Sequence, residues 1–334
     1  MTEVIAPGAP PIRGLRFRTV RDDDVPAMVR VINAACRANA NPEFRTEALL
    51  RSEMAHPSST DPYADDLLAF VGDELAAVAL LRFEDSNEGP RQYQTHCFVA
   101  PDWRRRGLGR AIFARNEARL RQIAGRHELL VEPVYTTWVD EPDVGARVLM
   151  EGGGYRMVRI YHHMLRPDML DIELPPVAEG IDIRPATRQD LSAVWDAMSE
   201  AFKDHFGGMD ISPAAFRRWS NSPRMDPDLV LVAFDGDEVA AAVQGAIVAE
   251  ENDANDYLRG WADPVFTRRA WRRRGLAAAV LGRTLARLRD RGMTSAQLSV
   301  DTKNPNDALS LYRRHRFESV HVETEWHKPM LLER

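Results

Sequence analysis

The chain of 334 residues is 44% hydrophobic and 28% charged, which is ordinary usage for globular enzymes. Its formal net charge of −6 argues against nucleic-acid binding over a whole surface, as does the lack of aromatic residues interleaved with the arginines. Cys36 and Cys97 are too few for a disulfide framework, and the N-terminus lacks the apolar run of a signal peptide. The expected location is therefore the cytoplasm, with no membrane segment.

An internal repeat organises the sequence. The hexapeptide Trp-Arg-Arg-Arg-Gly-Leu occurs at 103–108 and again at 271–276, an offset of 168 residues. A Gly-Asp-Glu segment followed by two alanines, at 72–77 and 236–241, repeats at an offset of 164. A period of this size is too long for a solenoid repeat and suits a self-sufficient α/β domain. The chain is therefore predicted to hold a duplicated domain.

The boundaries of the two predicted domains follow from composition. Residues 1–14 are rich in proline and glycine and predict a disordered lead-in. Residues 166–180 have Pro167, Pro175 and Pro176 without a helical period, which predicts a linker. The expected domains are 15–166 and 180–334.

The second half shows the order of elements most clearly. Turn, capping and periodicity signals, including a hairpin turn at 235–237 and Gly292 after a helix, separate these elements. The predicted strands are 181–184, 229–233, 239–249, 261–267, 296–301 and 319–327, and the predicted helices are 191–202, 213–219, 276–291 and 307–315. Residues 253–256 are expected to form a loop. This order predicts an α/β domain with a mixed sheet.

The repeated hexapeptide lies between a predicted strand and a predicted helix. The first turn of such a helix has free backbone N–H groups and the positive end of the dipole, which favour an anion. Small residues at Gly275, Ala277 and Ala278 let a phosphate approach the backbone, and the arginines add charge. The Gly-Lys-Ser/Thr of a nucleoside-triphosphate loop and the third glycine of a dinucleotide fingerprint are missing. The pattern indicates another diphosphate ligand.

These residues carry a family resemblance. Arg-x-x-Gly-x-Gly/Ala after a strand, present at 104–109 and 272–277, resembles the signature of the GCN5-related N-acetyltransferases (GNAT). Asn304 to Tyr312, followed by Phe317, resembles the family's last helix and its approach to the closing strand. The resemblance implies two tandem GNAT domains, each a mixed, mostly antiparallel sheet flanked by helices. It implies transfer of an acetyl group from acetyl-CoA to a primary amine of a small molecule or peptide, by direct attack in a ternary complex.

The same resemblance implies which residues hold acetyl-CoA. They belong to the strand before the loop, to the loop itself and to the turn before the last helix. In the second domain they are Val265, Phe266, Thr267, Arg272, Arg273, Arg274, Gly275, Leu276, Ala277, Ala278 and Asn304. In the first domain they are Cys97, Phe98, Val99, Arg104, Arg105, Arg106, Gly107, Leu108, Gly109 and Arg110.

The resemblance also implies catalytic groups. Tyr312 is expected to donate a proton to the departing thiolate, although a tyrosine of the core would fit the same pattern. A base is needed for the attacking amine, and Asp263 and then Asp301 are the candidates, each of which also suits a structural role at a strand end. No metal site is expected, because no set of Cys, His and Asp residues has a ligand spacing.

The first domain departs from the pattern where chemistry is expected. Met150 stands opposite Tyr312, and a thioether cannot donate a proton. No asparagine occupies the place of Asn304, yet the loop ending at Gly109 matches the signature better than its counterpart does. The first domain is thus expected to bind coenzyme A but to be poor in catalysis, an asymmetry that tandem members of the family show.

The acceptor is expected over 202–216 and 250–257 of the second domain, which include Asp204, His205 and several further acidic residues. The acidic residues would suit a cationic amine or form a solvated loop. A non-catalytic acyl-CoA-binding or regulatory protein is the alternative function. The quaternary state left open is a monomeric pseudo-dimer or a homodimer.

Overall fold

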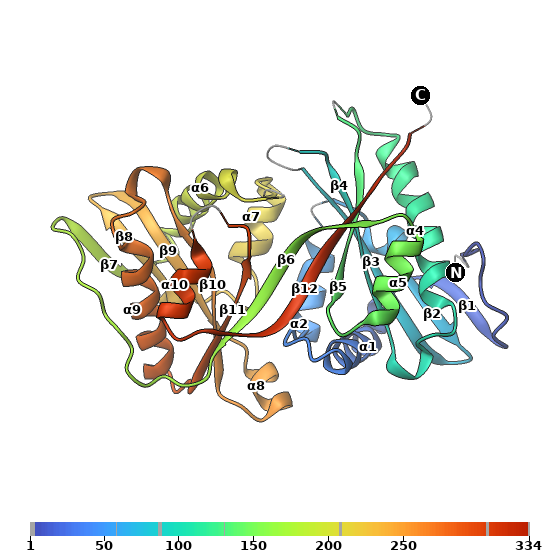
Figure 1. Cartoon of the computed structure of the whole chain (residues 1–334), viewed down its shortest axis with the longest axis horizontal. Coiled ribbons are helices and arrows are strands. Elements are labelled where there is room, and N and C mark those ends of the chain that lie inside the picture. The colour runs from blue at the N-terminus through green and yellow to red at the C-terminus, as the bar shows by residue number, and fades with distance from the viewer. Residues whose placement is uncertain are drawn as a thin grey trace. The chain divides into compact units, whose positions relative to one another are not determined.

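The computed structural model describes residues 4–57, 59–85, 89–129, 131–206, 209–304 and 307–332. The chain forms two compact units (Figure 1). Unit 1 comprises Met1–Ile160 and His321–Arg334, and unit 2 comprises Tyr161–Val320.

Unit 1 is a mixed sheet with helices on both faces. Its elements in chain order are β1 (Leu15–Thr19), η1 (Asp22–Asp24), α1 (Val25–Ala38), α2 (Glu47–Ala55), α3 (Pro62–Asp65), β2 (Leu67–Val71), β3 (Glu74–Glu84), β4 (Gln92–Val99), η2 (Pro101–Trp103), α4 (Leu108–Ala124), β5 (Val134–Asp140), α5 (Val144–Gly152) and the start of β6 (Arg156–Arg166), with most of β12 (Glu318–Pro329). The strand order is β1-β2-β3-β4-β5-β12. The pairings are antiparallel except that of β4 with β5.

Alternation along β3 divides the core of unit 1 into two layers. Val78 and Leu80 pack with α1 and α2 on one face, whereas Ala77 and Ala79 pack with α4 on the other. The apolar pattern of period two thus fixes which helix covers which face of the sheet.

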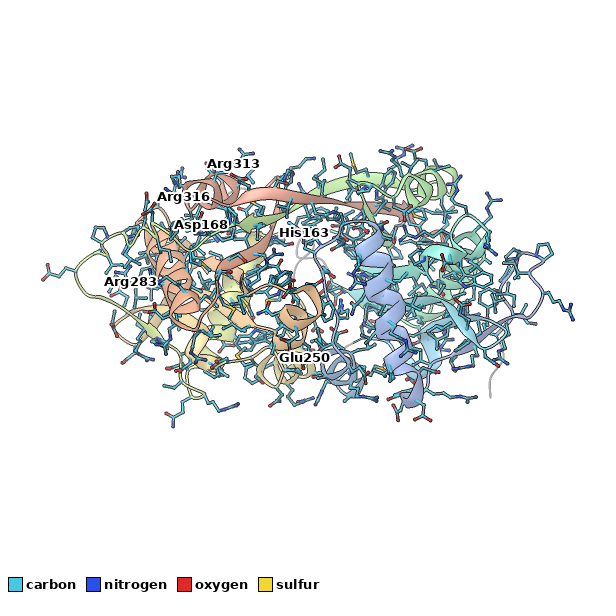
Figure 2. All side chains as sticks on the ribbon, turned by 90° about the horizontal axis from the view of Figure 1, so that it is seen from below. His163, Asp168, Glu250, Arg283, Arg313 and Arg316 are labelled. Carbon is cyan, nitrogen blue, oxygen red and sulfur yellow. The ribbon has the colours of Figure 1, made fainter. Side chains whose placement is uncertain are left out.

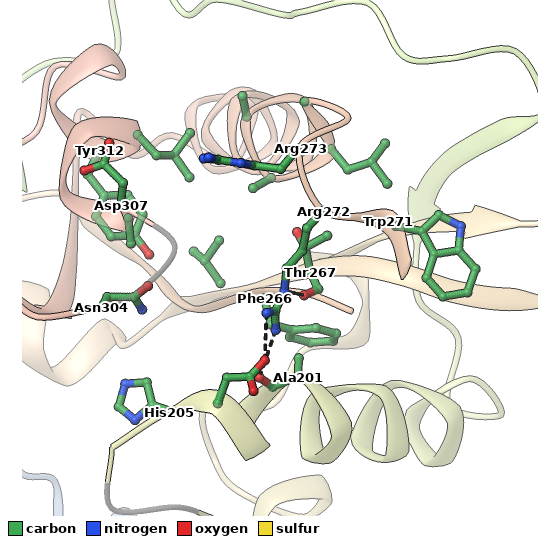
Figure 3. A pocket seen from close by; sticks show the side chains of 18 of the residues that line it. Ala201, His205, Phe266, Thr267, Trp271, Arg272, Arg273, Asn304, Asp307 and Tyr312 are labelled. Atoms are coloured by element: carbon green, nitrogen blue, oxygen red, sulfur yellow. Dashed lines mark hydrogen bonds and ion pairs between the residues drawn. The ribbon is translucent and has the colours of Figure 1, made fainter. Parts of the chain in front are cut away.

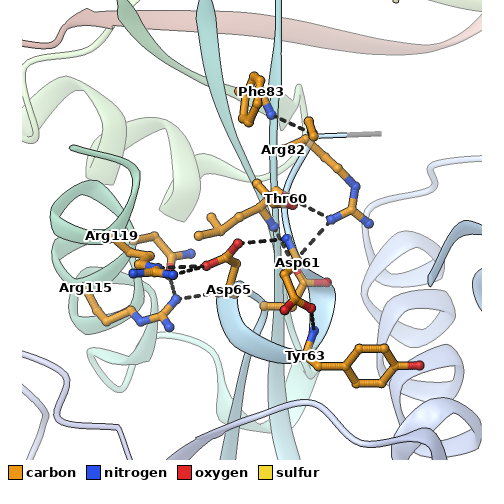
Figure 4. Close-up of polar contacts among 12 residues, drawn as sticks. Thr60, Asp61, Tyr63, Asp65, Arg82, Phe83, Arg115 and Arg119 are labelled. Carbon is orange, nitrogen blue, oxygen red and sulfur yellow. Dashed lines mark hydrogen bonds and ion pairs between the residues drawn. The ribbon is translucent and has the colours of Figure 1, made fainter. Parts of the chain in front are cut away.

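A polar cluster joins α3 to α4 (Figure 4): the Arg119 Nε donates to the Asp65 carboxylate at 2.7 Å.

Unit 2 repeats this plan. Its elements are the end of β6, β7 (Ile181–Pro185), α6 (Leu191–Ala201), η3 (Phe202–Asp204), α7 (Pro213–Ser220), η4 (Pro227–Leu229), β8 (Val230–Asp235), β9 (Glu238–Ile247), α8 (Ala249–Asn255), β10 (Arg259–Thr267), η5 (Arg269–Trp271), α9 (Leu276–Asp290), β11 (Ser295–Asp301) and α10 (Ala308–Arg314). The strand order is β6-β11-β10-β9-β8-β7, and only β10 and β11 pair in parallel among the recorded pairings. Val230 and Val232 face α6 and α7, and Leu231 and Ala233 face α9.

The acidic segment after β9 departs from the sequence-based expectation of a loop. Residues 249–255 form α8, and Glu251 on this helix is buried. Its carboxylate accepts hydrogen bonds from the Tyr257 hydroxyl, the Trp261 Nε1 and the Gln297 Nε2 at 2.7 to 3.0 Å. The predicted loop was wrong because the buried Glu251 finds three hydrogen-bond donors, of which Gln297 lies 46 residues away in sequence.

The two units differ from the predicted domains, 15–166 and 180–334, in their closing strands. β12, expected to close the second domain, pairs with β5 in unit 1, whereas β6 pairs with β11 in unit 2. Particular side chains favour this pairing: the His321 ring lies 2.8 Å from the Asp140 carboxylate, and the Lys328 ammonium lies 2.7 Å from that of Glu117. In unit 2 the buried Arg166 donates to the carbonyls of His315 and Asp168.

The predicted linker packs on α9 of unit 2. Arg283 donates to the Pro175 carbonyl at 3.1 Å, and Met169 is buried in the α9 cluster. Figure 2 labels Arg283 on the helix and Asp168 at the start of this segment. Next to Arg283, Gly282 lies so close to the Glu173 carbonyl that a Cβ at this position would overlap it. The segment is therefore docked along its length.

The lead-in of unit 1 is likewise ordered over 4–14, where the expectation of disorder was wrong. The Val4 amide donates to the Phe17 carbonyl at 2.9 Å, and Ala6 is buried in the apolar cluster beneath α4. The composition suggested disorder, but the apolar residues among the prolines pack on the apolar cluster beneath α4.

Gly282→Ala tests the docking of the linker. Alanine ordinarily stabilises a helix interior relative to glycine by about 1 kcal/mol, but the overlap with the Glu173 carbonyl should instead lower the unfolding free energy by about 1–3 kcal/mol. Chemical denaturation measures this change. The matched control is Gly152→Ala in α5, which meets nothing within 4 Å. Equal stability of the two variants would contradict the packing described.

Candidate active site

A cavity of about 310 Å³ opens in unit 2 at the end of β10 (Figure 3). It is enclosed by η3, the end of β10, the loop that leads into α9, and α10. Its lining includes Ala201, Phe202, Asp204, His205, Val265, Phe266, Thr267, Trp271, Arg272, Arg273, Gly275, Leu276, Ala277, Ala278, Asn304, Asp307, Ala308, Leu311, Tyr312 and Arg314. The expected coenzyme residues of the second domain, apart from Arg274, therefore come together with Tyr312 around one space.

The cavity exists because two parallel strands diverge. β10 and β11 pair only from Arg259 with Ser295 to Trp261 with Gln297, although both continue further. The Arg268 amide donates to the Ala240 carbonyl on β9. Because N–H directions alternate along a strand, the amides of Val265 and Thr267 point away from β9, toward the gap, and that of Phe266 points toward β9. A ligand in the gap meets two free donors.

Thr267 supplies a further polar group at the cavity. Its hydroxyl oxygen is buried and has no hydrogen-bond partner among the described residues. Buried polar groups without a partner are rare in folded proteins, and such a group often marks a place where a ligand or ordered water binds. The gap is thus suited to a polar ligand.

The loop from β10 to α9 has the backbone of an anion cradle. Arg273 and Gly275 take left-handed conformations, with φ of 63° and 79°, and Gly275 is the residue before the first turn of α9. A Cβ at Gly275 would meet nothing within 4 Å, so the approach to the helix N-terminus is open. The amides of Leu276, Ala277 and Ala278 are available there to an anion.

The three arginines of the loop have different places. Arg272 reaches back across the gap, where its guanidinium donates to the Asp204 carboxylate at 2.7 Å and to the carbonyl of Thr267 at 3.1 Å. Arg269 pairs with the same carboxylate, and these two arginines hold the pKa of Asp204 far below its ordinary value. Arg273 lines the cavity, and Arg274 is exposed outside the lining.

The sequence suggested that Asp204 is available to an acceptor, but in the structure its carboxylate is paired with two arginines. It fastens η3 to Arg269 and Arg272 in the segment between β10 and α9. Unit 1 has the same arrangement, because Arg104 donates to the Asn39 side chain at 2.7 Å and to the carbonyls of Val99 and Ala35. Residues 39 and 204 are separated by 165 residues, close to the period of the repeat. We call the contact of the first loop arginine with residue 39 or 204 the clamp. The repeat spacing is the feature of the sequence from which it could have been predicted.

Tyr312 lies on α10 and is 5% exposed. Its ring packs edge-on against Phe317 at 6.1 Å between centroids. Burial, with a smaller contribution from the Asp263 carboxylate, raises the pKa of Tyr312 well above its ordinary value. The hydroxyl therefore keeps its proton throughout the physiological pH range.

The two candidate bases differ in their surroundings. Asp263 lies where the register of β10 with β9 shifts, between Ala262 and Val265, and its charge acts on Tyr312. Asp301 is buried, and its carboxylate accepts from the Lys303 amide at 2.9 Å within the turn that leads to Asn304. Pro305 and Asn306 of that turn lie outside the described residues. Asp263 thus lies near Tyr312 and Asp301 is engaged within its own turn, and neither is among the residues that line the cavity.

In unit 1 the corresponding residues lie differently. Met150 is buried in the core beside Tyr155, whereas Tyr312 at the corresponding place in unit 2 lines the cavity. Arg106 stacks on Trp103 at 4.7 Å from the ring centroid. β4 pairs with β5 only from Gln92 to Gln94. The amides of Cys97 and Val99 point away from β3 and that of Phe98 toward it, because the Ala100 amide donates to the Ala76 carbonyl. The unit keeps the strand geometry without the acid.

Among the described residues, no three His, Cys, Asp or Glu side chains cluster so that they could hold a metal ion. No helix within the described ranges is long and apolar enough to cross a membrane.

Comparison with known proteins gives the family of the chain. The model of the acetyltransferase (GNAT) family matches residues 29–137 and again 193–317. The chain belongs to the GNAT family. Its duplication and its mixed sheets are those of a tandem GNAT protein, and the family makes it an acyltransferase.

The relatives of this GNAT protein include mycothiol acetyltransferases. That of Geodermatophilus obscurus is 27% identical over 92% of this chain and 97% of its own length, and that of Thermobispora bispora is 27% identical over 91% and 96%. A GCN5-related N-acetyltransferase from Sphaerobacter thermophilus superposes with a TM-score of 0.72 and 27% identity, covering 95% of this chain and 96% of that one. A tandem GNAT protein from the clavulanic acid biosynthesis pathway shares the fold, with a TM-score of 0.69 and 14% identity over 96% and 100% of the chains.

Gly275→Glu tests whether the open loop of unit 2 binds the diphosphate of the coenzyme. A carboxylate at the helix N-terminus should repel the phosphates and abolish binding of coenzyme A by unit 2, as measured by titration calorimetry. The matched control is Gly236→Glu in a hairpin of the same unit, because that glycine is also left-handed with open space around it. Unchanged coenzyme binding by Gly275→Glu would show that the loop is not the site.

Proposed function

We propose that unit 2 transfers the acetyl group of acetyl-CoA to a primary amine by direct attack in a ternary complex. The observation that carries this proposal is the meeting of three features in one cavity: strand amides that face a gap, an open helix N-terminus and a buried, protonated Tyr312. Family membership supports an acyltransferase, since GNAT acetyltransferases generally use acetyl-CoA.

In the proposed complex the diphosphate lies at the start of α9 and the pantetheine arm lies along the open edge of β10. The amides of Leu276, Ala277 and Ala278 would hold the phosphates, and Arg273 would add positive charge. The amides of Val265 and Thr267 would donate to the arm and to the thioester carbonyl oxygen. The Thr267 hydroxyl is placed to give or accept one more hydrogen bond.

The chemical step forms a C–N bond and breaks the C–S bond of the thioester. Asp263 would take a proton from the amine, directly or through water, as the nitrogen attacks the carbonyl carbon. When the tetrahedral intermediate collapses, Tyr312 would give its proton to the leaving sulfur, so that coenzyme A departs as the thiol. Tyr312 is protonated at physiological pH, as a general acid must be before the transfer.

The acceptor is proposed to be the amine of a small molecule or peptide. The name of the relatives makes mycothiol and its deacetylated amine the first compounds to test. Aminoglycosides, amino acids and short peptides complete the panel. Tight coenzyme binding without thiol release with any amine would favour a non-catalytic acyl-CoA-binding protein instead.

Tyr312→Phe tests the assignment of the acid. Loss of the hydroxyl should lower kcat by about 10²-fold or more, with little effect on coenzyme affinity, because the group acts on the leaving sulfur. The assay follows free thiol released from acetyl-CoA in the presence of the best amine. Tyr155→Phe is the control, since that hydroxyl bonds to Glu117 in unit 1. A kcat equal to that of the unmodified chain would remove Tyr312 from the mechanism.

The pH dependence of kcat gives an independent test. Because the pKa of Tyr312 is raised above its ordinary value of about 10, the acid stays protonated and kcat should not fall as pH rises from 7 to about 10. A decline below pH 9 that is absent from Tyr312→Phe would contradict the environment assigned to this residue.

A further inference from the structure

The phosphate loop of unit 1 has the same backbone as its active counterpart. Arg105 and Gly107 have φ of 61° and 89°, against 63° and 79° for Arg273 and Gly275. Helix α4 begins at Leu108 just as α9 begins at Leu276. Any difference in coenzyme binding must therefore come from what lies over the loop.

In unit 1 the chain itself lies over the loop. A Cβ at Gly107 would be 3.3 Å from the Pro10 Cβ and 3.6 Å from its Cγ, whereas a Cβ at Gly275 meets nothing within 4 Å. A phosphate oxygen must come to about 2.9 Å from the backbone amides to be bound. The proline ring thus packs on the residue that precedes the first turn of α4, on the side where the loop of unit 2 has open space.

The segment that carries Pro10 is fastened at both ends. The Val4 amide donates to the Phe17 carbonyl at 2.9 Å, and the Gly14 carbonyl accepts from the Gly72 amide at 3.1 Å. Ala6 is 6% exposed, and Val4 and Ile12 pack on the cluster that contains Leu108, Ala111 and Ile112 of α4. Residues 4–12 contain no charged side chain and are held on α4 by apolar contacts.

Helix α5 packs beside the start of α4. A Cβ at Gly109 would lie 3.2 Å from the Leu149 Cδ2, and the Arg105 guanidinium lies against Gly145. The space between α4 and α5 thus contains side chains of unit 1 itself.

In unit 2 the segment that precedes the domain takes another path and leaves the loop at Gly275 open. The linker there crosses α9 at Gly282, about 10 Å along the helix from its start at 1.5 Å per residue. The residue of α4 at the same place in the repeat is Ala114. A Cβ at Gly282 would overlap the crossing chain. The Cβ of Ala114 would therefore prevent the lead-in from crossing α4 at the same place.

We propose that residues 4–14 form an intramolecular lid over the diphosphate site of unit 1, so that the chain offers one open coenzyme site, in unit 2. The lid goes beyond the proposed function, because it concerns the loop that takes no part in the reaction. With the lid released, the retained backbone of the loop would bind the diphosphate of coenzyme A.

The test counts coenzyme A bound to the full chain by calorimetry. The unmodified chain should bind one equivalent and Gly275→Glu none. Adding Ala6→Asn to Gly275→Glu places a polar side chain in the apolar contact and should restore one equivalent. Adding Ala9→Asn instead should restore none, because Ala9 is exposed on the same segment. Amide hydrogen exchange over 4–14 verifies release, and deletion of residues 2–9 replaces Ala6→Asn if the segment stays protected.

Two equivalents bound by the unmodified chain, or one retained by Gly275→Glu, would overturn the lid. So would a released segment without a gain of binding. Failure of the proposed function looks different: the unmodified chain would then bind no coenzyme or release no thiol, while binding gained on release of the lid would still support this proposal.

Discussion

The divergence of one pair of parallel strands is the constraint on which the candidate site depends. β10 and β11 share three paired positions and then separate, which leaves backbone donors of β10 without a strand partner. The loop that follows turns through Arg273 and Gly275 so that α9 starts at the mouth of this gap. Two sources of free amides, a strand edge and a helix N-terminus, therefore face one cavity.

The duplication kept this construction in both units and changed what surrounds it. The clamp of the first loop arginine survives, with Asn39 in unit 1 where unit 2 has Asp204. The acid did not survive, since Met150, which has no hydroxyl, stands at the place of Tyr312. In unit 1 Pro10 packs on Gly107 of the loop, whereas the space at Gly275 in unit 2 is open.

Local signals in the sequence were sufficient for the loops, the helices around them and the place of Tyr312 on the cavity, because each depends on residues close together in the chain. Contacts over long separations could not be predicted in this way. The partner of Arg272 lies 68 residues earlier, so a presumed phosphate ligand proved to be bound to Asp204. The exchange of β6 and β12 depends on contacts such as His321 with Asp140, 181 residues apart.

Placing the chemistry in the cavity of unit 2 has a consequence that can be measured. Gly107→Glu and Gly275→Glu can be assayed side by side for thiol release from acetyl-CoA, with the same amine and with folding checked by circular dichroism. We expect turnover close to that of the unmodified chain for Gly107→Glu and none for Gly275→Glu. Loss of turnover in a folded Gly107→Glu, with activity retained by Gly275→Glu, would contradict this placement.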